Sequence, residues 1–281
     1  MSTAGRGMAL GALGVLIFAM TLPMTRLAVG PAWAPQLPPG FVTAGRAAAA
    51  GLLSLAYLRW VGAARPTAAQ WRLLGLSGLG TVLGFPLGLA IALREVPSMH
   101  AAVVTGLLPL STAALAALLL RQRASGGFWV CAVLGCALVL AFAWREGGGQ
   151  LVPADGWLLL AMACASSGYI AGARLATQMP AEQVISWVLV GALPLTLPAA
   201  WWTAPADWAR VSAPAWGAFA YVSLFSMWLG FFAWYRGLAQ GGALRVSQVQ
   251  LLQPFLSLLL AVPRSEEHTS ELQSQSTISY A

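Results

Sequence analysis

Long apolar stretches, separated by short polar loops, follow one another along the chain. A helix of about 20 apolar residues spans the hydrocarbon core of a bilayer, which is about 30 Å thick. The pattern predicts nine membrane-spanning helices, at about residues 8–30, 40–60, 71–93, 98–120, 126–144, 156–176, 183–203, 214–235 and 243–263. Ten-residue segments of alternating polarity, typical of outer-membrane barrels, are not part of this pattern. We therefore expect an all-α, polytopic membrane helical bundle.

The composition is that of a protein whose solvent is lipid. Of the 281 residues, 59% are hydrophobic and only 8% are charged. A soluble domain carries about 25% charged residues, because its surface must be hydrated. The formal net charge of +7 would suggest nucleic-acid binding in a soluble protein, but here the basic residues lie mostly at helix ends. Arginines at helix ends set membrane topology, so we expect no nucleic-acid partner.

The distribution of arginine between the loops predicts how the chain enters the membrane. Cytoplasmic loops carry more Arg and Lys than loops on the other side. The N-terminus and the second and fourth loops hold six arginines: Arg6, Arg59, Arg65, Arg72, Arg121 and Arg123. The third, fifth and seventh loops hold one each: Arg94, Arg145 and Arg210. We therefore expect a multi-pass protein of the bacterial cytoplasmic (inner) membrane with a cytoplasmic N-terminus.

Residues 264–281 break with the apolar pattern. They begin with RSEEHTSELQS, which resembles the translation of a widely used sequencing-library adapter, and end with QSTISYA, which is similar to the adapter's continuation through an index. A native, disordered polar tail is the alternative interpretation. We expect an artefactual tail that is foreign to the fold, and a native protein that continues past Pro263.

Two short motifs recur at nearly the same spacing in the two halves of the chain. Arg26 ends the first predicted helix and Arg174 the sixth, an offset of 174 − 26 = 148. Pro109 in the fourth helix corresponds to Pro254 in the ninth, an offset of 254 − 109 = 145. A unit of five helices is odd in number, so its second copy must cross the membrane in the opposite orientation. Secondary transporters often have such inverted repeats, with the substrate near the membrane midplane between them.

The order and spacing of four motifs resemble a known family. These motifs are residues 18–23 (FAMTLP) followed by Arg26 in helix one, Arg46 before the Ala-rich part of helix two, the Pro109 stretch of helix four, and Gln253-Pro254 in helix nine. With them, the chain is similar to bacterial EamA-type members of the drug/metabolite transporter superfamily. The resemblance implies ten helices that export or exchange small metabolites.

Under this resemblance, the chain divides into two repeats. We expect the first at residues 8–145, with helices one to five, and the second at 154–263, with helices six to nine. Nine helices are then visible, and the tenth of the 5+5 arrangement is missing. One departure from the family stands out after helix four, where a Gly-Glu pair is common and this chain has Arg121-Gln122. The role of that loop acid is therefore not carried over.

A polar stripe in helix nine is a candidate for the substrate-binding site. Gln250, Gln253 and Ser257 have an i, i+3, i+7 spacing, so they share one helical face. The offset of 145 assigns Thr105 and Thr112 of helix four to equivalent positions. The alternative is that these side chains only connect helices, with about 0.6 kcal/mol for each contact. Both interpretations remain open at this point.

Four further residues belong to the candidate site. Pro109 and Pro254 each remove a backbone hydrogen bond and expose a carbonyl, so we expect them to act as hinges. Arg46, in helix two, either faces the bundle interior or extends to the membrane surface, because an Arg in lipid is costly. Tyr169 in helix six is a further candidate for substrate binding.

Three other features give weaker expectations. His100 titrates near neutral pH and could couple protons to transport, but it lies near the start of helix four without an obvious carboxylate partner. Trp234 and Tyr235 lie beside Arg236 near a helix end, so we expect them in an interfacial aromatic belt. Glycines that recur every four residues predict close helix packing in helix three: Gly80, Gly84 and Gly88.

These features favour a secondary transporter of small metabolites, amino-acid-like or drug-like, that works by alternating access. The expected partners are a small-molecule substrate and the lipid bilayer, with a proton as candidate coupling ion and a second copy as candidate homodimer partner. The alternative is a membrane-embedded lipid-modifying enzyme or a non-transporting scaffold. An enzyme needs a nucleophile and base, or metal ligands, at membrane depth, whereas the predicted helices contain no Asp or Glu. We expect no catalytic residue, cofactor or metal.

Overall fold

The computed structural model describes residues 2–121, 125–147, 152–257 and 259–260, and the regular elements in this part of the chain are all helices. Six are long and apolar enough to cross a membrane: Thr3–Val29, Pro39–Trp60, Ala68–Glu95, Pro153–Leu175, Ala181–Trp202 and Ala213–Gly241. Shorter apolar helices lie at Leu108–Leu119 and Gly126–Leu138. The prediction of an all-α membrane bundle is confirmed. The segment 264–281, expected to be foreign, lies outside the described residues.

The first repeat contains helices one to five. In chain order these are α1 (Thr3–Ala19) with α2 (Thr21–Val29), α3 (Pro39–Trp60), α4 (Ala68–Gly78) with the π-helical η1 (Leu79–Gly84) and α5 (Phe85–Glu95), α6 (Ser98–Thr105) with α7 (Leu108–Leu119), and α8 (Gly126–Gly147).

The second repeat contains helices six to nine. These are α9 (Pro153–Leu175), α10 (Ala181–Trp202), α11 (Ala213–Tyr221) with the π-helical η3 (Val222–Leu229) and α12 (Gly230–Gly241), and α13 (Ala243–Val246) with the 3-10 segment η4 (Ser247–Leu252). A short 3-10 turn, η2 (Trp208–Arg210), lies in the loop before helix eight.

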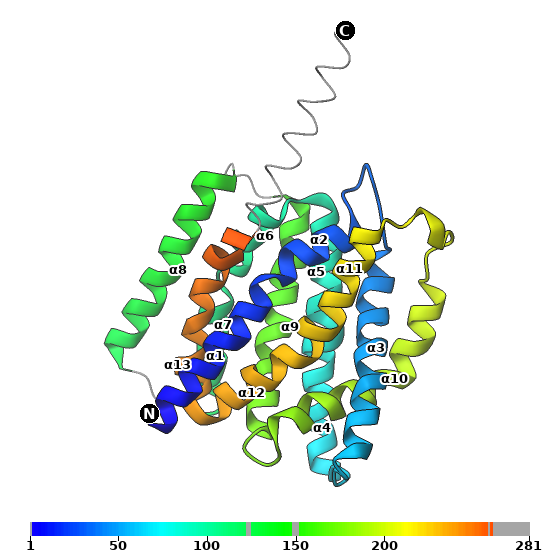
Figure 1. Cartoon of the computed structure of the whole chain (residues 1–281). Coiled ribbons are helices and arrows are strands. Elements are labelled where there is room, and N and C mark those ends of the chain that lie inside the picture. The colour runs from blue at the N-terminus through cyan, green and yellow to red at the C-terminus, as the bar shows by residue number, and fades with distance from the viewer. Residues whose placement is uncertain (1, 122–124, 148–151, 258, 261–281) are drawn as a thin grey trace.

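The two repeats cross the bundle in opposite directions. In Figure 1, helix one rises from the N-terminus while helix six descends, and helices two and seven, three and eight, and four and nine are opposed in the same way. The contacts have the same symmetry, because helix one packs along helix eight as helix six packs along helix three. Helix two packs on helix seven, and helix four on helix nine. The inverted repeat that an odd number of helices predicts is therefore present.

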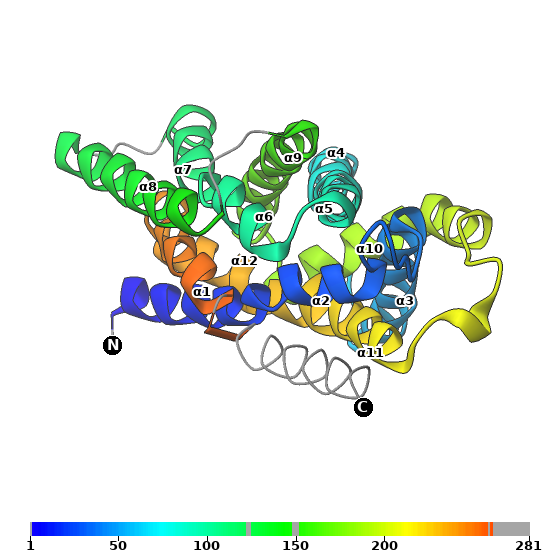
Figure 2. The same ribbon diagram turned by 90° about the horizontal axis from the view of Figure 1, so that it is seen from above.

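Seen from above, the helices form two layers. Helices one and eight lie in one layer, and helices three, four and six lie in the other (Figure 2). Helix five lies at one edge of the bundle, and helices two and seven lie at the opposite edge. The larger cluster of buried apolar side chains includes members of both repeats. Each layer thus contains helices of both repeats, and the repeats contact each other within the layers as well as between them.

Helices three and eight contain equivalent irregularities. The π-helical segments η1 and η3 begin at residues 79 and 222, an offset of 222 − 79 = 143, and end at residues 84 and 229, an offset of 229 − 84 = 145. A π turn interrupts the regular hydrogen-bond ladder of an α-helix and is frequent at functional sites. The repeats are thus equivalent in their irregular backbone as well as in their order of helices.

Helix one breaks at a proline. α1 ends at Ala19 and α2 begins at Thr21. Pro23 has no N–H, so the Ala19 carbonyl lacks its usual helical donor. The hydroxyl of Ser257, from helix nine, donates a hydrogen bond to that carbonyl at 2.6 Å. A side chain of the second repeat therefore pairs with the carbonyl that the proline frees in the first.

Helices four and nine change geometry at the two prolines that the repeat relates. α6 ends at Thr105, and α7 starts with Pro109 in its first turn. In helix nine, the 3-10 segment η4 ends at Leu252, directly before Gln253 and Pro254. Both predicted hinges therefore lie at breaks in regular helix, although hinge motion itself stays a prediction.

The glycines of helix three make the close contact that their spacing predicts. A Cβ atom on Gly80 would overlap the carbonyl oxygen of Cys164, and one on Gly84 would lie 2.5 Å from the Cys164 Sγ atom. A Cβ atom on Gly88 would lie 2.8 Å from the Trp157 carbonyl oxygen. Helices three and six thus touch backbone to backbone, and the prediction of close packing is confirmed.

The expected aromatic belt at Trp234 and Tyr235 is wrong. Both side chains are fully buried. The Trp234 ring packs edge-on against Phe18 and Tyr169, and the Tyr235 hydroxyl is 2.9 Å from Ser77 Oγ. Their place near the end of a helix suggested an interfacial position, but helix one packs along α12 and covers it.

Candidate functional site

Two adjoining cavities lie between the repeats. They share four lining residues: Thr21, Phe85, Leu108 and Gln253. We therefore treat them as two lobes of one central cavity, the Gln250 lobe and the Arg46 lobe. Both lobes are narrow, with room for little more than a water molecule. A metabolite can enter only after the helices move apart.

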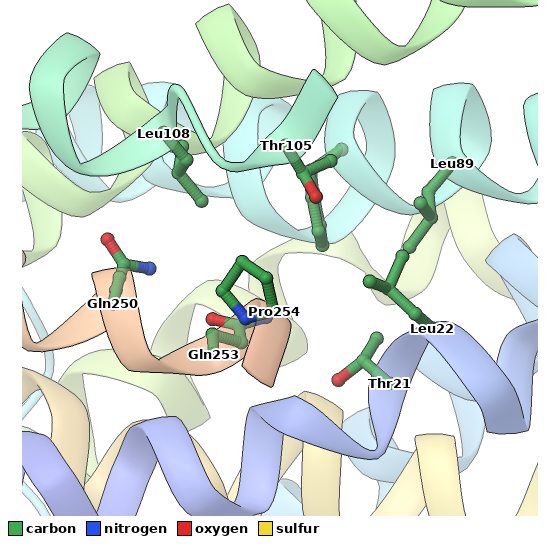
Figure 3. Close-up of a pocket in the computed structure, with 9 residues that line it drawn as sticks. Thr21, Leu22, Leu89, Thr105, Leu108, Gln250, Gln253 and Pro254 are labelled. Atoms are coloured by element: carbon green, nitrogen blue, oxygen red, sulfur yellow. The ribbon is translucent and has the colours of Figure 1, made fainter. Parts of the chain in front are cut away.

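Helices four and nine form facing walls of the Gln250 lobe. Thr105 and Leu108 come from helix four, and Gln250, Gln253 and Pro254 come from helix nine (Figure 3). Helices one and three complete the lining. The structure therefore brings together three predicted binding residues and one predicted hinge, and their role in binding stays a prediction.

The polar groups of the Gln250 lobe differ in how they are satisfied. The Thr105 hydroxyl donates to the Ala101 carbonyl at 2.8 Å, within its own helix. Gln253 Nε2 donates to the Phe18 carbonyl at 3.4 Å. The side-chain amide of Gln250 is buried, and neither its nitrogen nor its oxygen makes a hydrogen bond of regular geometry among the described residues, although the Tyr169 hydroxyl lies close enough to interact with it. Apart from that contact, its donor and acceptor are available at this wall.

Arg46 lies inside the second lobe. Its side chain is only 2% exposed, so of the two alternatives, the bundle interior is correct. Its Nη2 atom donates to Ser226 Oγ at 3.0 Å, and Ser226 Oγ lies 2.8 Å from Thr21 Oγ1. The Nε and Nη1 atoms are buried without a partner in the described part of the chain. The guanidinium is thus held at Nη2, whereas Nε and Nη1 have no described partner.

The rest of the Arg46 lobe is mainly aromatic and apolar. Tyr169, a predicted site residue, lies close enough to Arg46 to interact with it electrostatically. The remaining lining residues are Phe18, Thr81, Phe85, Leu108, Phe231 and Gln253. A ligand here would meet one cation, a few hydroxyl and amide groups, and aromatic walls.

Two predicted binding residues, Thr112 and Ser257, lie outside the lining of both lobes, as does the predicted hinge Pro109. Thr112 Oγ1 is 3.2 Å from Ser166 Oγ, in the contact between α7 and α9. Ser257 donates to the carbonyl that Pro23 leaves free. The predicted stripe assumed α-helical winding, whereas Ser247–Leu252 is a 3-10 helix, with about three residues per turn. Thr112 and Ser257 therefore match the alternative interpretation, in which these polar side chains only connect helices.

Three lining residues were missed at the level of sequence. Thr21 corresponds to Tyr169 by the offset 169 − 21 = 148, and Thr81 corresponds to Ser226 by 226 − 81 = 145. All four line the Arg46 lobe. The two repeat offsets, 148 for Thr21 and 145 for Thr81 and Ser226, would therefore have found these residues, if they had been applied to every polar residue of the apolar segments.

Residues 5–144 and 152–277 each match the EamA-like transporter family. The chain belongs to this family. It is 45% identical to the uncharacterized transporter YdeK of Bacillus subtilis (strain 168) over 251 residues, which are 89% of this chain and 86% of the relative. The uncharacterized transporter YyaM of the same organism is 25% identical over 209 residues, which are 70% of this chain and 66% of that protein.

The fold is shared with solved structures. A crystal structure of a protein superposes with a TM-score of 0.72 at 22% identity, over 92% of this chain and 89% of that chain. The expected family resemblance is confirmed, and this EamA-like chain is a multi-pass membrane transporter. The second matched range includes part of the segment 264–281, so the expectation of a foreign tail stays a prediction.

A hydrogen bond between the repeats lies at the end of the EamA-like bundle away from the N-terminus. His100 Nε2, on α6, is 2.6 Å from Asp155 Oδ1, in the first turn of α9. The expectation that His100 lacks a carboxylate partner is therefore wrong. Asp155 lies just before the sixth apolar segment, and only the fold brings it to His100. Its second oxygen accepts the Val152 N–H at 2.9 Å.

A hydrogen-bonded contact between the repeats lies toward the other end of the bundle. The Ser77 hydroxyl, near the end of α4, is shared between the Gly168 carbonyl at 3.1 Å and the Tyr235 hydroxyl at 2.9 Å. It thereby connects helices three, six and eight. The central cavity of this EamA-like transporter thus lies between two polar contacts, each made across the repeats.

Proposed function

We propose that this EamA-like chain is a secondary transporter that exports or exchanges small metabolites by alternating access. The observation that carries the proposal is the central cavity, because equivalent positions of both repeats line it: Thr21 and Tyr169, Thr81 and Ser226, and Thr105 and Gln250. Secondary transporters with inverted repeats bind substrate at this interface and move one repeat against the other.

The contacts at the two ends support a gating mechanism. His100–Asp155 joins the repeats at one end, and Ser77–Tyr235 joins them toward the other. Opening one contact while the other stays closed exposes the cavity to one side of the membrane at a time. The described state has both contacts intact and a narrow cavity, which is what an occluded intermediate requires.

We propose that the N-terminus faces the cytoplasm of a bacterial cell. The end of the bundle where the chain starts carries exposed arginines, as expected for a cytoplasmic face: Arg6, Arg59, Arg65, Arg72, Arg121, Arg174, Arg236 and Arg245. At the opposite end, Arg26 donates to the carbonyls of Leu93 and Arg94 and is half-buried. The His100–Asp155 contact then faces outward and the Ser77–Tyr235 contact inward.

We propose His100 as the residue through which a proton acts on transport. Protonated His100 forms an ion pair with Asp155, whereas neutral His100 keeps only a hydrogen bond, so the strength of the outer contact depends on the proton. His100→Gln retains a polar side chain that cannot titrate. Flux through this variant should no longer respond to a pH gradient across proteoliposomes. A response equal to that of the unmodified chain would rule His100 out.

The rival enzymatic function has less support. The polar side chains that line the described cavity are Thr, Ser, Tyr, Gln and Arg, without a carboxylate or histidine to act as a base. Among the described residues, no group of three or more His, Cys, Asp or Glu could hold a metal ion. Binding and release of an unchanged molecule need neither.

Counterflow in proteoliposomes tests the transport function. Vesicles that contain the full chain are loaded with one unlabelled compound from a panel of amino acids and monocarboxylates, and entry of the same labelled compound is measured. We expect counterflow of at least one compound that empty vesicles lack and that Gln250→Leu/Gln253→Leu reduces. If no compound exchanges, or if the double variant exchanges like the unmodified chain, the proposed function is wrong.

A further inference from the structure

We propose that the Arg46 lobe is a subsite for a single carboxylate, so that the transported molecules are amphipathic monocarboxylates. This inference rests on the proposed function, because it takes the central cavity as the transport site. It goes further by naming the chemical class that the cavity recognises and the residue that recognises it.

The guanidinium of Arg46 is positioned for a ligand. Ser226, itself hydrogen-bonded to Thr21, holds the Nη2 atom. The Nε and Nη1 atoms are buried without a partner among the described residues, and the side chain lines the cavity. A carboxylate pairs with an edge of the planar guanidinium, where one Nη2 N–H lies beside either Nε–H or an Nη1 N–H. Nη2 keeps a second N–H beyond its bond to Ser226, so this N–H and the unpaired Nε or Nη1 can donate two parallel hydrogen bonds to one carboxylate.

No described acid neutralises Arg46. Asp155 contacts His100, Glu182 pairs with Arg236, and Asp207 pairs with Arg210. Glu95, the last acid whose side chain the structure describes, ends α5 and is exposed. An uncompensated charge inside a membrane protein is costly and typically marks a substrate pathway. A bound anion would supply the missing negative charge.

The charge of the cavity selects a monoanion. Arg46 is the only charged side chain among the described lining residues of the two lobes. The repeat offsets of 142 to 148 place its counterpart among residues 188–194 of helix seven, VLVGALP, which carry no charge. Gln253 also lacks a polar counterpart at the offset of 145, where Leu108 lies, but Arg46 is the residue that makes the charge of the cavity asymmetric. A phosphate ester, with close to two negative charges, would leave one uncompensated, whereas one carboxylate leaves none.

The walls indicate the rest of the substrate. Phe18, Tyr169 and Phe231 surround the Arg46 lobe with aromatic rings, which offer apolar surface to a hydrocarbon or aromatic group. In the adjoining lobe, the side-chain amide of Gln250 can bind a second polar group. Together these features fit a molecule with one carboxylate and an apolar body. Once the helices separate, the Gln250 lobe can also hold a polar substituent of that molecule.

Binding to the purified full chain in detergent tests the subsite with three matched probes. These are 3-phenylpropionate, its uncharged amide 3-phenylpropionamide, and phenyl phosphate. Affinity is taken from the rise in Tm with probe concentration, since a ligand that binds the folded state stabilises it. We expect 3-phenylpropionate to bind at least about tenfold more tightly than either other probe, because it alone makes a charge-matched pair with Arg46.

Variants test whether the preference for 3-phenylpropionate depends on Arg46. Arg46→Gln should lower the affinity for 3-phenylpropionate to that for the amide, whereas Arg46→Lys should keep part of the preference through its charge. Arg174→Gln is the matched control, because it makes the same change at an exposed position of helix six and should leave the preference intact. If the Arg46→Gln protein is unfolded, the Arg46→Lys result decides, since loss of the bidentate fork should still weaken binding several-fold.

Each other result overturns the proposal. Equal binding of acid and amide, tighter binding of phenyl phosphate, no binding of 3-phenylpropionate, or a preference that survives Arg46→Gln would each show that Arg46 is not a carboxylate site. The outcomes for the two proposals are separable. Arg46-dependent binding without counterflow contradicts transport and keeps the subsite, whereas counterflow unchanged by Arg46→Gln contradicts the subsite and keeps transport.

Discussion

The free-energy cost of placing Arg46 inside the bundle indicates whether the residue serves binding or structure. An Arg at the centre of a membrane helix costs about 2.5–3.5 kcal/mol on insertion scales. The hydrogen bond from Arg46 to Ser226 contributes only about 1 kcal/mol to stability. A buried Arg that serves stability would have hydrogen-bond partners for all its N–H groups. In Arg46 only Nη2 has a described partner.

Arg46→Met should therefore leave the ligand-free protein as stable as before or stabilise it, by up to about 4 kcal/mol. Methionine fills a similar length without a charge or unpaired donors. Tm in detergent measures the change, and counterflow measures the accompanying loss of transport. A large drop in Tm together with normal flux would mean that Arg46 is a structural residue.

Gln250 gives a second prediction of the same kind. Its buried amide makes no hydrogen bond of regular geometry among the described residues, and an unsatisfied buried polar group costs about 1–3 kcal/mol. Gln250→Leu should thus raise the free energy of unfolding by about that amount and reduce flux. The matched control is Thr112→Val, which breaks the bond to Ser166 outside the cavity and should lower stability by about 1 kcal/mol with flux unchanged. The opposite pattern would assign transport to the Thr112 contact instead.

The sequence could predict some of the individual residues that line the cavity. Gln250 and Gln253 were found because polar residues are rare in apolar segments and these two share a helical face, and Thr105 was found from the repeat offset to Gln250. Ser226 was missed because a serine is common in membrane helices, and its role depends on Arg46 of another helix. The pairing of His100 with Asp155 was missed for a similar reason, since 55 residues separate them.

The helices are held by close backbone contacts that single glycines permit. Gly80→Ala should destabilise the protein by about 1–3 kcal/mol, because the new methyl group would meet the backbone of helix six. Gly75→Ala is the control in the same helix, since a methyl group there would have no neighbour within 4 Å, and it should be neutral or stabilising. Unfolding in detergent compares the two. Equal effects would mean that helices three and six do not touch at Gly80.

The break in helix four should matter for motion rather than for binding. Pro109→Ala restores an N–H and lets α6 and α7 join into a more regular helix, so we expect counterflow to slow several-fold while probe affinity stays the same. Pro194→Ala is the control, because Pro194 lies inside the continuous helix α10 and outside both lobes. Normal flux in Pro109→Ala would remove the hinge role from this proline.

The sequence predicted the helices well and their irregularities only in part. Hydropathy located the six helices that are long enough to cross a membrane and the two shorter apolar helices, since the length of an apolar run decides whether it spans a membrane. The prolines marked the breaks in helices four and nine. The π-helical segments η1 and η3 have the same apolar composition as their surroundings, so no periodicity distinguishes them. The burial of Trp234 and Tyr235 depends on which helix covers them, and composition does not contain that information.

At the scale of the whole molecule, the inverted repeat explains why a cavity exists at all. Helices one to four and six to nine, which cross the bundle in opposite directions, place equivalent polar positions around one cavity that lies between two polar contacts. The odd number of helices predicted this symmetry before any contact was known. The one charged residue of the cavity, Arg46 in helix two, makes the cavity asymmetric. Its role in specificity could be argued only after the structure placed it in the cavity.

Accessibility of the central cavity from each side of the membrane is the sharpest test of alternating access. A single cysteine is introduced by Thr105→Cys in a chain whose three native cysteines, Cys131, Cys136 and Cys164, are replaced by alanine. Right-side-out and inside-out vesicles are then treated with a membrane-impermeant maleimide. We predict labelling from both sides, with His100→Gln raising the rate only from the outside and Tyr235→Phe only from the cytoplasmic side. Labelling from one side alone in every variant, or gate variants that act on the same side, would contradict alternating access through this cavity.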